Sequence, residues 1–303
     1  STGRDIKFDL GRMEGFRNFC NKLWNAARYV LMNTEGFDPA TPSHRSEADE
    51  WILSRLQTTI TETANSIEQY RFDHAAQTLY DFVWNEYCDW YLELSKTILS
   101  SNNKKNIKEV KIISGFIFKQ SLILLHPFVP FITEELWLKN KLANNKEKYL
   151  MYTPWIKDNK SLKNEEIKIV NQIIDVISRI RSFKNELNIS PGSFVEISIK
   201  SLSKKKQDLF VKNQIMLKKL GRISSIFLDD SQKKAANLVI SGEILKIYFD
   251  ETVDLNLIRE NLVNKLKKLS NELQNIGKKL DNRSFIEKAP YHIVEKEKNT
   301  YNE

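Results

Sequence analysis

The chain has 303 residues, of which 41% are hydrophobic and 11% aromatic, and its formal net charge is +8 at pH 7. This length exceeds one typical compact domain and the composition is that of globular proteins, so we expect two folded units and exclude a mainly disordered chain. No run approaches the roughly 18 consecutive apolar residues of a membrane span, and no apolar signal-peptide core opens the chain, so a cytoplasmic protein without membrane contact is expected.

The residues that most often carry metal or acid–base chemistry are few. Cys20 and Cys88 are the two cysteines, and each lies in a helical pattern beside aromatic residues. Free cysteine in such a setting behaves as a small buried hydrophobe, so we expect neither a disulfide nor a metal site. No constellation of Ser, Cys or carboxylate groups accompanies His74 or His126 at helical spacing, so structural roles are expected for both.

Charge is divided unevenly along the chain. Residues 1–100 contain ten Lys and Arg against fifteen Asp and Glu, whereas the remaining 203 contain 37 against 24. A basic half is typical of proteins that bind polyanions, because phosphates bound by Lys and Arg release counterions. A lysine-rich composition without any such partner explains the charge equally well.

The first 155 residues show the spacing of long amphipathic helices. Apolar residues recur at three and four between residues 11 and 33, and similar patterns predict helices over 47–70, 73–100, 110–125 and 133–142. The proline-containing stretch 38–45 reads as a loop. Long helices with short links predict an antiparallel bundle, with the last helix as a short cap.

After residue 155 the pattern changes. A predicted helix over 162–187 precedes the Ser190-Pro191-Gly192 break, and strand-like segments follow near 195–199, 223–228, 237–240 and 244–249. We therefore predict a mainly α protein in which a helix bundle precedes a small α+β domain. The predicted boundaries are 1–155 for the bundle, 156–252 for the small domain and 253–303 for a coiled-coil arm.

The predicted arm rests on a heptad-like pattern. Apolar residues from Leu255 to Leu280 step by three and four, nearly as in a coiled-coil seam. A returning helix could begin at Pro290, but the residues that remain are too few to cover the whole seam. Either the chain continues beyond residue 303 or the seam is only partly covered.

Several segments closely resemble the valyl-tRNA synthetase family: STGRDI at 1–6, RNFCNKLWNAARYVLMN at 17–33 and YDFVWNEYCDWYLELSK at 80–96. HPFVPFITEELW at 126–137 is shared more widely with the isoleucyl and leucyl enzymes, and NISPG, FIEKAP and VEKEK near the end also look valyl-like. The resemblance covers essentially the whole chain and is weakest over 200–246. It implies a class I anticodon-binding bundle, a small α+β domain and a C-terminal coiled-coil arm.

The resemblance also implies that catalysis and tRNA binding lie in different segments of a larger protein. Neither the HIGH nor the KMSKS signature for ATP binding occurs in the sequence, so this segment should not aminoacylate by itself. Catalytic and editing domains are then expected upstream in the same chain, where ATP and Mg would be bound, with no cofactor in this segment. The implied partner is tRNA(Val), to which the parent enzyme attaches valine, and a monomer is expected.

Candidate anticodon-binding residues lie mostly on the first helix. Single-stranded bases are read by aromatic stacking and by polar side chains on their exposed edges. Spacings of four, three and four place one such stripe on the helix, and the resemblance adds three positions; the full set is Arg12, Arg17, Asn21, Trp24, Arg28, Tyr29 and Leu92. Trp24, Tyr29 and Leu92, the last imagined as a wedge between bases, could equally be core residues.

Three polar residues of the third predicted helix are expected to stabilise the bundle and not to contact RNA. Asn85, Glu86 and Asp89 form an acidic surface that is unsuited to phosphate. We expect them to hold neighbouring helices or to orient Arg side chains.

Candidate contacts to the tRNA elbow lie on the arm, which valyl enzymes are thought to rest there. They are Lys268, Asn275, Lys278, Lys279 and Arg283. A solvated lysine face that keeps a coiled coil soluble is the alternative. The function that competes with tRNA binding is a helical protein-interaction scaffold, in which the bundle and the heptad seam recruit another chain without RNA.

Overall fold

The computed structural model describes residues 10–34, 46–139, 148–156, 164–231, 235–249, 253 and 255–282, together with positions 294, 295, 298 and 300. The predicted loop over 38–45 and the returning segment at Pro290 lie outside these residues. The chain divides into two compact units, one comprising Ser1–Ser178 with Leu202–Ile223 and the other Arg179–Ser201 with Ser224–Glu303. The predicted domain boundaries at 155 and 252 stay a prediction.

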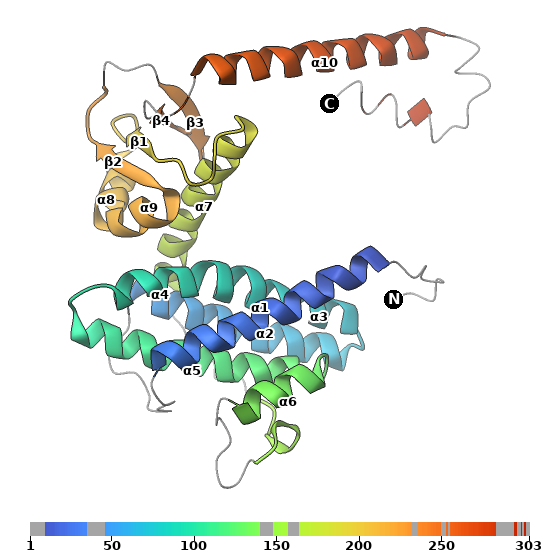
Figure 1. Ribbon diagram of the computed structural model, residues 1–303, viewed down its shortest axis with the longest axis vertical. Helices are drawn as coiled ribbons and strands as arrows, with labels where there is room; N and C mark the ends of the chain where they lie inside the picture. Colours follow the sequence, from blue (N-terminus) through green and yellow to red (C-terminus); the bar gives the residue numbers. More distant parts are fainter. Residues whose placement is uncertain are drawn as a thin grey trace. The chain divides into compact units, whose positions relative to one another are not determined.

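The first unit is built on a helical bundle, as predicted (Figure 1). Its elements are α1 (Leu10–Thr34), α2 (Glu47–Glu68), α3 (Phe72–Asp81), η1 (Phe82–Tyr91), α4 (Leu92–Leu99), α5 (Lys104–Leu125), α6 (Pro130–Lys139) and the 3₁₀ turn η2 (Leu150–Tyr152). Helix α5 begins six residues before its apolar pattern does, because its first turns are mostly lysine and asparagine. Asn103 caps it by accepting from the Asn106 backbone N–H at 3.2 Å.

Large aromatic side chains fill the core of the bundle. Trp51 of α2, Tyr87 of η1, Phe118 of α5 and Trp137 of α6 are all fully buried. The Tyr87 hydroxyl donates to the Ser114 carbonyl at 2.8 Å, so this buried polar atom is satisfied. Burial raises the pKa of Tyr87 well above its usual value.

The third predicted helix is one continuous rod, but its middle is π-helical. Segment η1 lies between α3 and α4, and at its end the Leu92 N–H donates to the Tyr87 carbonyl five residues earlier. Apolar periodicity does not separate an α-turn from a π-turn where most residues are aromatic. The prediction of a helix over 73–100 is therefore confirmed in extent and differs in hydrogen-bond pattern.

Two helices were not predicted from the sequence. α8 (Lys204–Lys212) and α9 (Gln214–Gly221) follow the first strand, and they belong to the first unit together with α7 (Asn164–Glu186) up to Ser178. α9 packs against α4. In α7, Asn171 accepts a 2.9 Å hydrogen bond from the Trp51 indole, which fixes α7 to α2.

The second unit contains the predicted small sheet. Strands β1 (Val195–Ser198), β2 (Ile223–Phe227), β3 (Ala236–Ile240) and β4 (Glu243–Phe249) pair in the order β2-β1-β4-β3. β3 and β4 form a hairpin whose two loop residues, Ser241 and Gly242, both have positive φ. Such a turn matches the twist of antiparallel strands and explains the glycine.

Helix α10 (Leu255–Asp281) confirms the extent of the heptad pattern. Its seam residues Leu262, Leu266, Leu269 and Leu273 are 39 to 67% exposed, so no other described segment covers them. None of the described helices is both long and apolar enough to cross a lipid bilayer.

Candidate nucleic-acid interface

Helix α1 lies against the bundle with one polar stripe facing outward. Phe19, Leu23 and Val30 are buried between α5 and η1. Arg17, Asn21 and Arg28 are exposed, as the three-four spacing predicts. Arg17 makes a 3.7 Å ion pair with Glu14 one turn earlier, a contact between two exposed side chains that costs little to break. A partner can therefore reach two guanidinium groups and an amide along one face.

Trp24 and Tyr29 are partly buried. The sequence left open whether each ring contacts a base or packs in the core, and the structure places each at the edge of the core. The Trp24 ring packs against the core, and the ammonium of Lys139 lies 5.1 Å from its centroid. The Tyr29 ring also borders the core, and Lys96 lies 5.6 Å from its centroid. Each ring thus offers part of its surface to solvent beside a cation, a pairing suited to a base and its phosphate.

The orientation of Tyr29 is fixed by helix α4. Its hydroxyl lies 2.9 Å from the Ser95 hydroxyl, which donates its own proton to the Leu92 carbonyl at 2.7 Å. Since that proton is engaged, Tyr29 is the donor to Ser95. Burial raises the pKa of Tyr29, and the Ser95 hydrogen bond opposes the rise. The ring is therefore held at both ends before any ligand binds.

Leu92 does not fit the role predicted for it. Its side chain is only 5% exposed and packs in the core of the bundle. A buried side chain cannot wedge between bases, so this part of the prediction is corrected: Leu92 supports the Tyr29–Ser95 pair through its carbonyl. The physical reason is the turn of η1 and α4, which directs Leu92 inward together with Tyr91 and Leu94. Arg12 lies in α1, but its side chain is outside the described residues.

The acidic residues of η1 hold helix partners, as predicted. Glu86 forms a two-pronged ion pair with Arg55 of α2 and raises the pKa of the guanidinium. Asp89 pairs with Lys22 of α1, whose ammonium also lies 3.9 Å from the centroid of the Trp84 ring. Asn85 donates to Asp81 within the same rod. These contacts fix α1 and α2 against η1 and neutralise Lys22.

The histidines have local partners. His126 lies 2.8 Å from the Thr133 hydroxyl and 4.0 Å from Glu134, whose carboxylate also accepts backbone N–H groups of η2. His74 contacts Arg71 at the start of α3. Within the described part of the chain no three His, Cys, Asp or Glu side chains come close enough to hold a metal ion.

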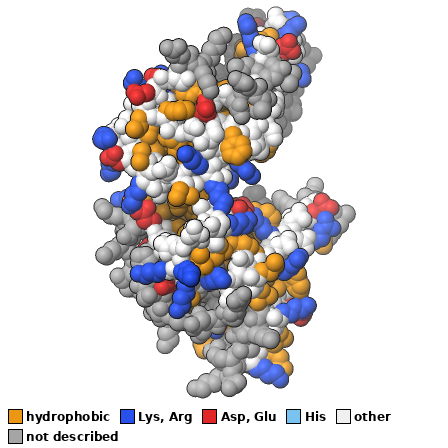
Figure 2. Space-filling view, turned by 60° about the vertical axis from the view of Figure 1, so that its left-hand side comes forward, with side chains coloured by type: hydrophobic (Ala, Val, Ile, Leu, Met, Phe, Trp, Pro, Cys, Tyr) orange, Lys and Arg blue, Asp and Glu red, His pale blue; other side chains and the backbone are white. Residues whose placement is uncertain are grey.

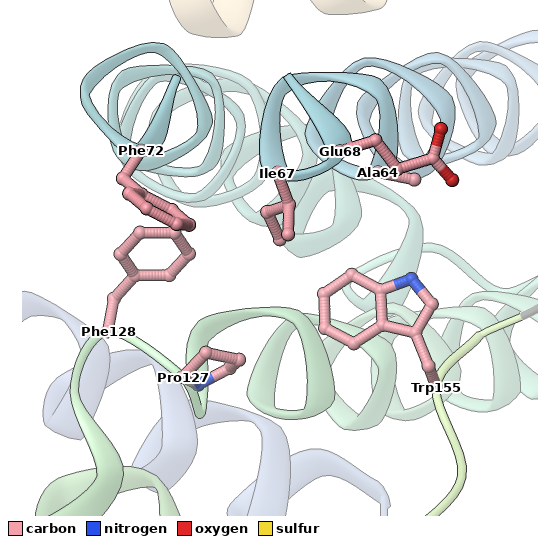
Figure 3. A pocket seen from close by; sticks show the side chains of 7 residues that line it. All are labelled: Ala64, Ile67, Glu68, Phe72, Pro127, Phe128 and Trp155. Atoms are coloured by element: carbon pink, nitrogen blue, oxygen red, sulfur yellow. The ribbon is translucent and has the colours of Figure 1, made fainter. Parts of the chain in front are cut away.

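A pocket of about 650 Å³ opens between α2, the start of α3 and the turn after α5. Figure 3 shows the rings of Phe72 and Phe128 facing each other across it, with Ile67 and Trp155 beside them. Glu68 contributes the single charged side chain among the described lining residues. An apolar pocket with so few polar groups has no arrangement for acid–base or nucleophilic chemistry.

The predicted arm residues lie in the second unit. Lys268, Asn275, Lys278 and Lys279 are all exposed on α10. Arg283 lies outside the described residues. The side chains flanking Trp24 and Tyr29, Lys139 and Lys96, were missed from the sequence; Lys139 is 115 positions from Trp24, and no local pattern links the two.

Comparison with known proteins agrees with this geometry. Residues 49–199 match the family described as the anticodon-binding domain of tRNA ligase, and residues 254–303 match the valyl tRNA synthetase tRNA binding arm. Among curated relatives, the valine–tRNA ligases of Pelagibacter ubique, Coxiella burnetii and Petrotoga mobilis are 45, 38 and 36% identical over 100, 98 and 98% of this chain.

The chain spans about a third of the length of these relatives, 35, 33 and 34% respectively. The relatives match along essentially the whole chain, including residues 200–246, which neither of the two family matches covers. The chain therefore belongs to the valyl-tRNA synthetase family and corresponds to the C-terminal third of its members.

Proposed function

We propose that this chain is the tRNA-binding part of a valine–tRNA ligase, with the anticodon loop on the outer face of α1 and the tRNA elbow on α10. The observation that carries the proposal is the outward polar stripe of α1 beside two half-exposed rings, in a chain matched over its length by valine–tRNA ligases. Affinity and anticodon discrimination would then be separate from the chemistry of the parent enzyme.

The α1 surface supplies each kind of contact that a single-stranded loop needs. Arg17 and Arg28 can bind phosphates or base edges, and the Asn21 amide can pair with a base edge, because all three are exposed. Tyr29 offers a ring whose orientation is already fixed by Ser95, so little freedom is lost when a base stacks on it. Trp24, under Lys139, is a second candidate ring. We keep Arg12 as a candidate on the resemblance alone.

The arm supplies electrostatic contacts of a different kind. Lys268, Asn275, Lys278 and Lys279 are exposed on a helix, and Lys278 and Lys279 lie in its last turn. Lysine binds phosphate as a point charge without demanding a fixed geometry, which suits a contact to a folded RNA backbone. Arg283 would extend this row beyond the described residues.

The activity of the whole protein is part of the same proposal. The parent enzyme would attach valine to tRNA(Val) with ATP, and ATP and Mg would bind in catalytic sequence that this chain does not contain. Catalytic and editing domains of the same polypeptide would be its intramolecular partners. We place the parent in the cytoplasm, as a monomer, with domain boundaries in this segment at 155 and 252.

Titration of the chain with labelled tRNA(Val) and with a non-cognate tRNA, each at two salt concentrations, tests the proposal. We expect tighter binding of tRNA(Val) and a loss of affinity at the higher salt, because phosphate contacts release counterions. Equal affinity for both transcripts would remove the anticodon assignment. Absence of binding to either would remove the proposed function altogether.

One observation favours a protein-interaction scaffold as the second candidate. The apolar seam of α10 is exposed at Leu262, Leu266, Leu269 and Leu273, and a heptad seam of this kind can pair with another helix. Sedimentation of the chain over a range of concentrations distinguishes the two functions. Self-association that depends on these leucines, together with no affinity for tRNA, would support the scaffold.

A further inference from the structure

A second basic surface lies at one end of the bundle, on residues to which neither the sequence nor the comparisons give a role. Lys104, Lys105 and Lys108 are exposed and Lys111 is partly exposed on the first two turns of α5. None of the four forms an ion pair within the described part of the chain. The one acid among them, Glu109, is 6% exposed and faces inward.

This arrangement is unfavourable for the isolated helix. Lys104, Lys108 and Lys111 are spaced by four and three, so they share one face and repel each other. No acidic residue lies in the first turn of α5, where the positive end of the helix dipole further disfavours cations. Because local stability opposes these lysines, a counter-charge from a partner is the simplest reason for their presence.

The surface continues onto a second helix, α9. Lys219 of α9 donates a 3.2 Å hydrogen bond to the Ser100 hydroxyl in the turn before α5, so α9 is held beside the same end of the bundle. Lys218 is its partly exposed neighbour. Figure 2 is turned so that the left side of Figure 1 comes forward, and it shows Lys and Arg side chains gathered on this part of the bundle.

The basic end is also close to the candidate anticodon surface. α1 packs along α5 in the same unit, with exposed Arg28 near the C-terminal end of α1 (Figure 1). Lys104 and Lys111 are seven positions apart, which is about 10 Å along the helix axis. That length matches roughly three successive nucleotides at 3.4 Å each along a duplex strand. Around the row, Asn102 and Asn103 are exposed amides, whereas exposed large hydrophobic side chains are missing from the described residues 96–111.

We infer that the lysines of α5, with Lys218 and Lys219 of α9, bind the sugar–phosphate backbone of the RNA stem that carries the loop read by α1. This inference rests on the proposed function. The stem contact fixes the register of the loop, while the α1 side chains read its bases. An acidic protein is the other class of partner for such a surface. The lysine row of α5 lacks the apolar anchors that a protein interface needs at its centre, and the exposed Ile215 lies at the α9 edge of the surface.

The test uses the whole chain with Lys104→Gln, Lys105→Gln and Lys108→Gln combined. We expect at least about tenfold weaker binding of tRNA(Val), and a slope of log K against log salt that is smaller by about two to three. Lysine is unfavourable at these positions, so the thermal midpoint of the variant should be unchanged or raised. A lowered midpoint with an unchanged salt slope would overturn the inference.

Two control variants test whether the effect depends on the position of the α5 lysines or only on the net charge of the chain. The triple replacement by Arg keeps the charge and should keep the slope. Neutralisation of Lys168, Lys204 and Lys205, three exposed lysines of the same unit on α7 and α8, removes the same net charge elsewhere and should lower the slope by less. An equal effect of both neutralised triples would show a general charge effect and would overturn the inference.

The RNA used in the titration distinguishes this inference from the proposed function. The Lys104, Lys105, Lys108 variant should bind an anticodon stem–loop more weakly than the unmodified chain, and should bind the unpaired loop oligonucleotide almost as well. Equal weakening for both RNAs would contradict a stem contact. If the unmodified chain binds tRNA(Val) and only α1 variants weaken it, the inference fails while the proposed function stands; if the unmodified chain binds no RNA, both fail.

Discussion

The hydroxyl of Tyr91 donates a 2.7 Å hydrogen bond to the carboxylate of Asp49, which is 1% exposed. The second oxygen of that carboxylate accepts from the backbone N–H of Ser46 at 2.9 Å and from its hydroxyl at 2.7 Å. One buried carboxylate therefore joins the end of η1 to the N-terminal cap of α2, and both of its oxygens are satisfied. Burial and the nearby Asp49 charge raise the pKa of Tyr91 well above its usual value.

Replacing Tyr91 by Phe should destabilise the chain. The change removes one donor from a buried charged acceptor and leaves the rest of the packing in place, so we expect a loss of about 1–3 kcal/mol in the free energy of unfolding. Urea denaturation followed by circular dichroism measures it, with the m-value checked for constancy.

Tyr80→Phe is the matched control for this prediction. The Tyr80 ring stacks with both Phe19 and Trp84, but its hydroxyl makes no hydrogen bond to any described residue. Its removal should change the free energy of unfolding by less than about 0.5 kcal/mol. Similar losses in Tyr91→Phe and Tyr80→Phe would show that the Asp49 bond contributes nothing.

The sequence predicted the elements well and their long-range contacts poorly. Helix α1 and strand β4 follow from apolar spacing, because α1 buries one face from Phe19 to Val30 and β4 buries Leu245 and Ile247. The Asp49–Tyr91 bond joins residues 42 positions apart, and no local pattern encodes it. For the same reason α8 and α9 escaped prediction: both are short, α8 is rich in polar residues, and α9 packs against α4.

The candidate site shows the same division. The exposed stripe of Arg17, Asn21 and Arg28 follows from helix geometry alone. For Leu92 the sequence left both a base contact and burial open, because local spacing does not tell which face an aromatic-rich rod turns inward; the structure buries it. Lys104, Lys105 and Lys108 were overlooked because they precede the apolar pattern that marked the fourth helix.

Tyr29 should contribute to binding through its ring and not through its hydroxyl. Tyr29→Ala removes a stacking surface and should weaken binding of tRNA(Val) by about 5- to 150-fold, the equivalent of 1–3 kcal/mol per stacked base. Tyr29→Phe keeps the ring and loses only the bond to Ser95, so its effect on affinity should be under about threefold. Fluorescence anisotropy with labelled transcript gives both values.

Ser95→Ala provides the complementary control. This change removes the Ser95 hydroxyl, which accepts the hydrogen bond from Tyr29, and leaves the Tyr29 ring intact. Thermal unfolding should show a modest loss of stability, while affinity for tRNA(Val) should stay close to that of the unmodified chain. If Tyr29→Ala binds as tightly as Tyr29→Phe, Tyr29 does not stack on a base.

The two cysteines should differ sharply in reactivity. Burial raises the pKa of the Cys88 thiol to about 12, against a smaller opposing effect of Lys22, whereas Cys20 is partly exposed. At pH 8.5 Cys88 is therefore protonated and inaccessible, and iodoacetamide should modify Cys20 alone, as read by mass spectrometry of the intact chain. In Cys20→Ser no modification is expected until urea unfolds the protein.

The raised pKa of Cys88 also has a consequence for stability. The folded state holds this proton more tightly than the unfolded state does, so the contribution is fully present below the ordinary thiol pKa of about 8.5. It is lost as the pH rises from there toward about 12. The free energy of unfolding of Cys88→Ala should therefore fall less between about pH 8.5 and pH 12 than that of the unmodified chain. An equal fall in both would contradict a buried, protonated thiol at this position.

Neutralising the end of α10 should flatten the salt dependence of tRNA binding without altering the bundle. Lys278 and Lys279 occupy the last turn of α10, where the helix dipole favours cations, so some stability of that turn is lost with them. In the variant Lys278→Gln with Lys279→Gln, each lost phosphate contact should lower the slope of log K against log salt by about one. Arg at both positions keeps the charge and should keep the slope. If the Gln variant binds tRNA(Val) with the same salt slope as the unmodified chain, these lysines do not contact the elbow. An anticodon stem–loop RNA has no elbow and serves as the second control. If the Gln variant also shows a reduced slope with this RNA, the lysines act only through long-range attraction.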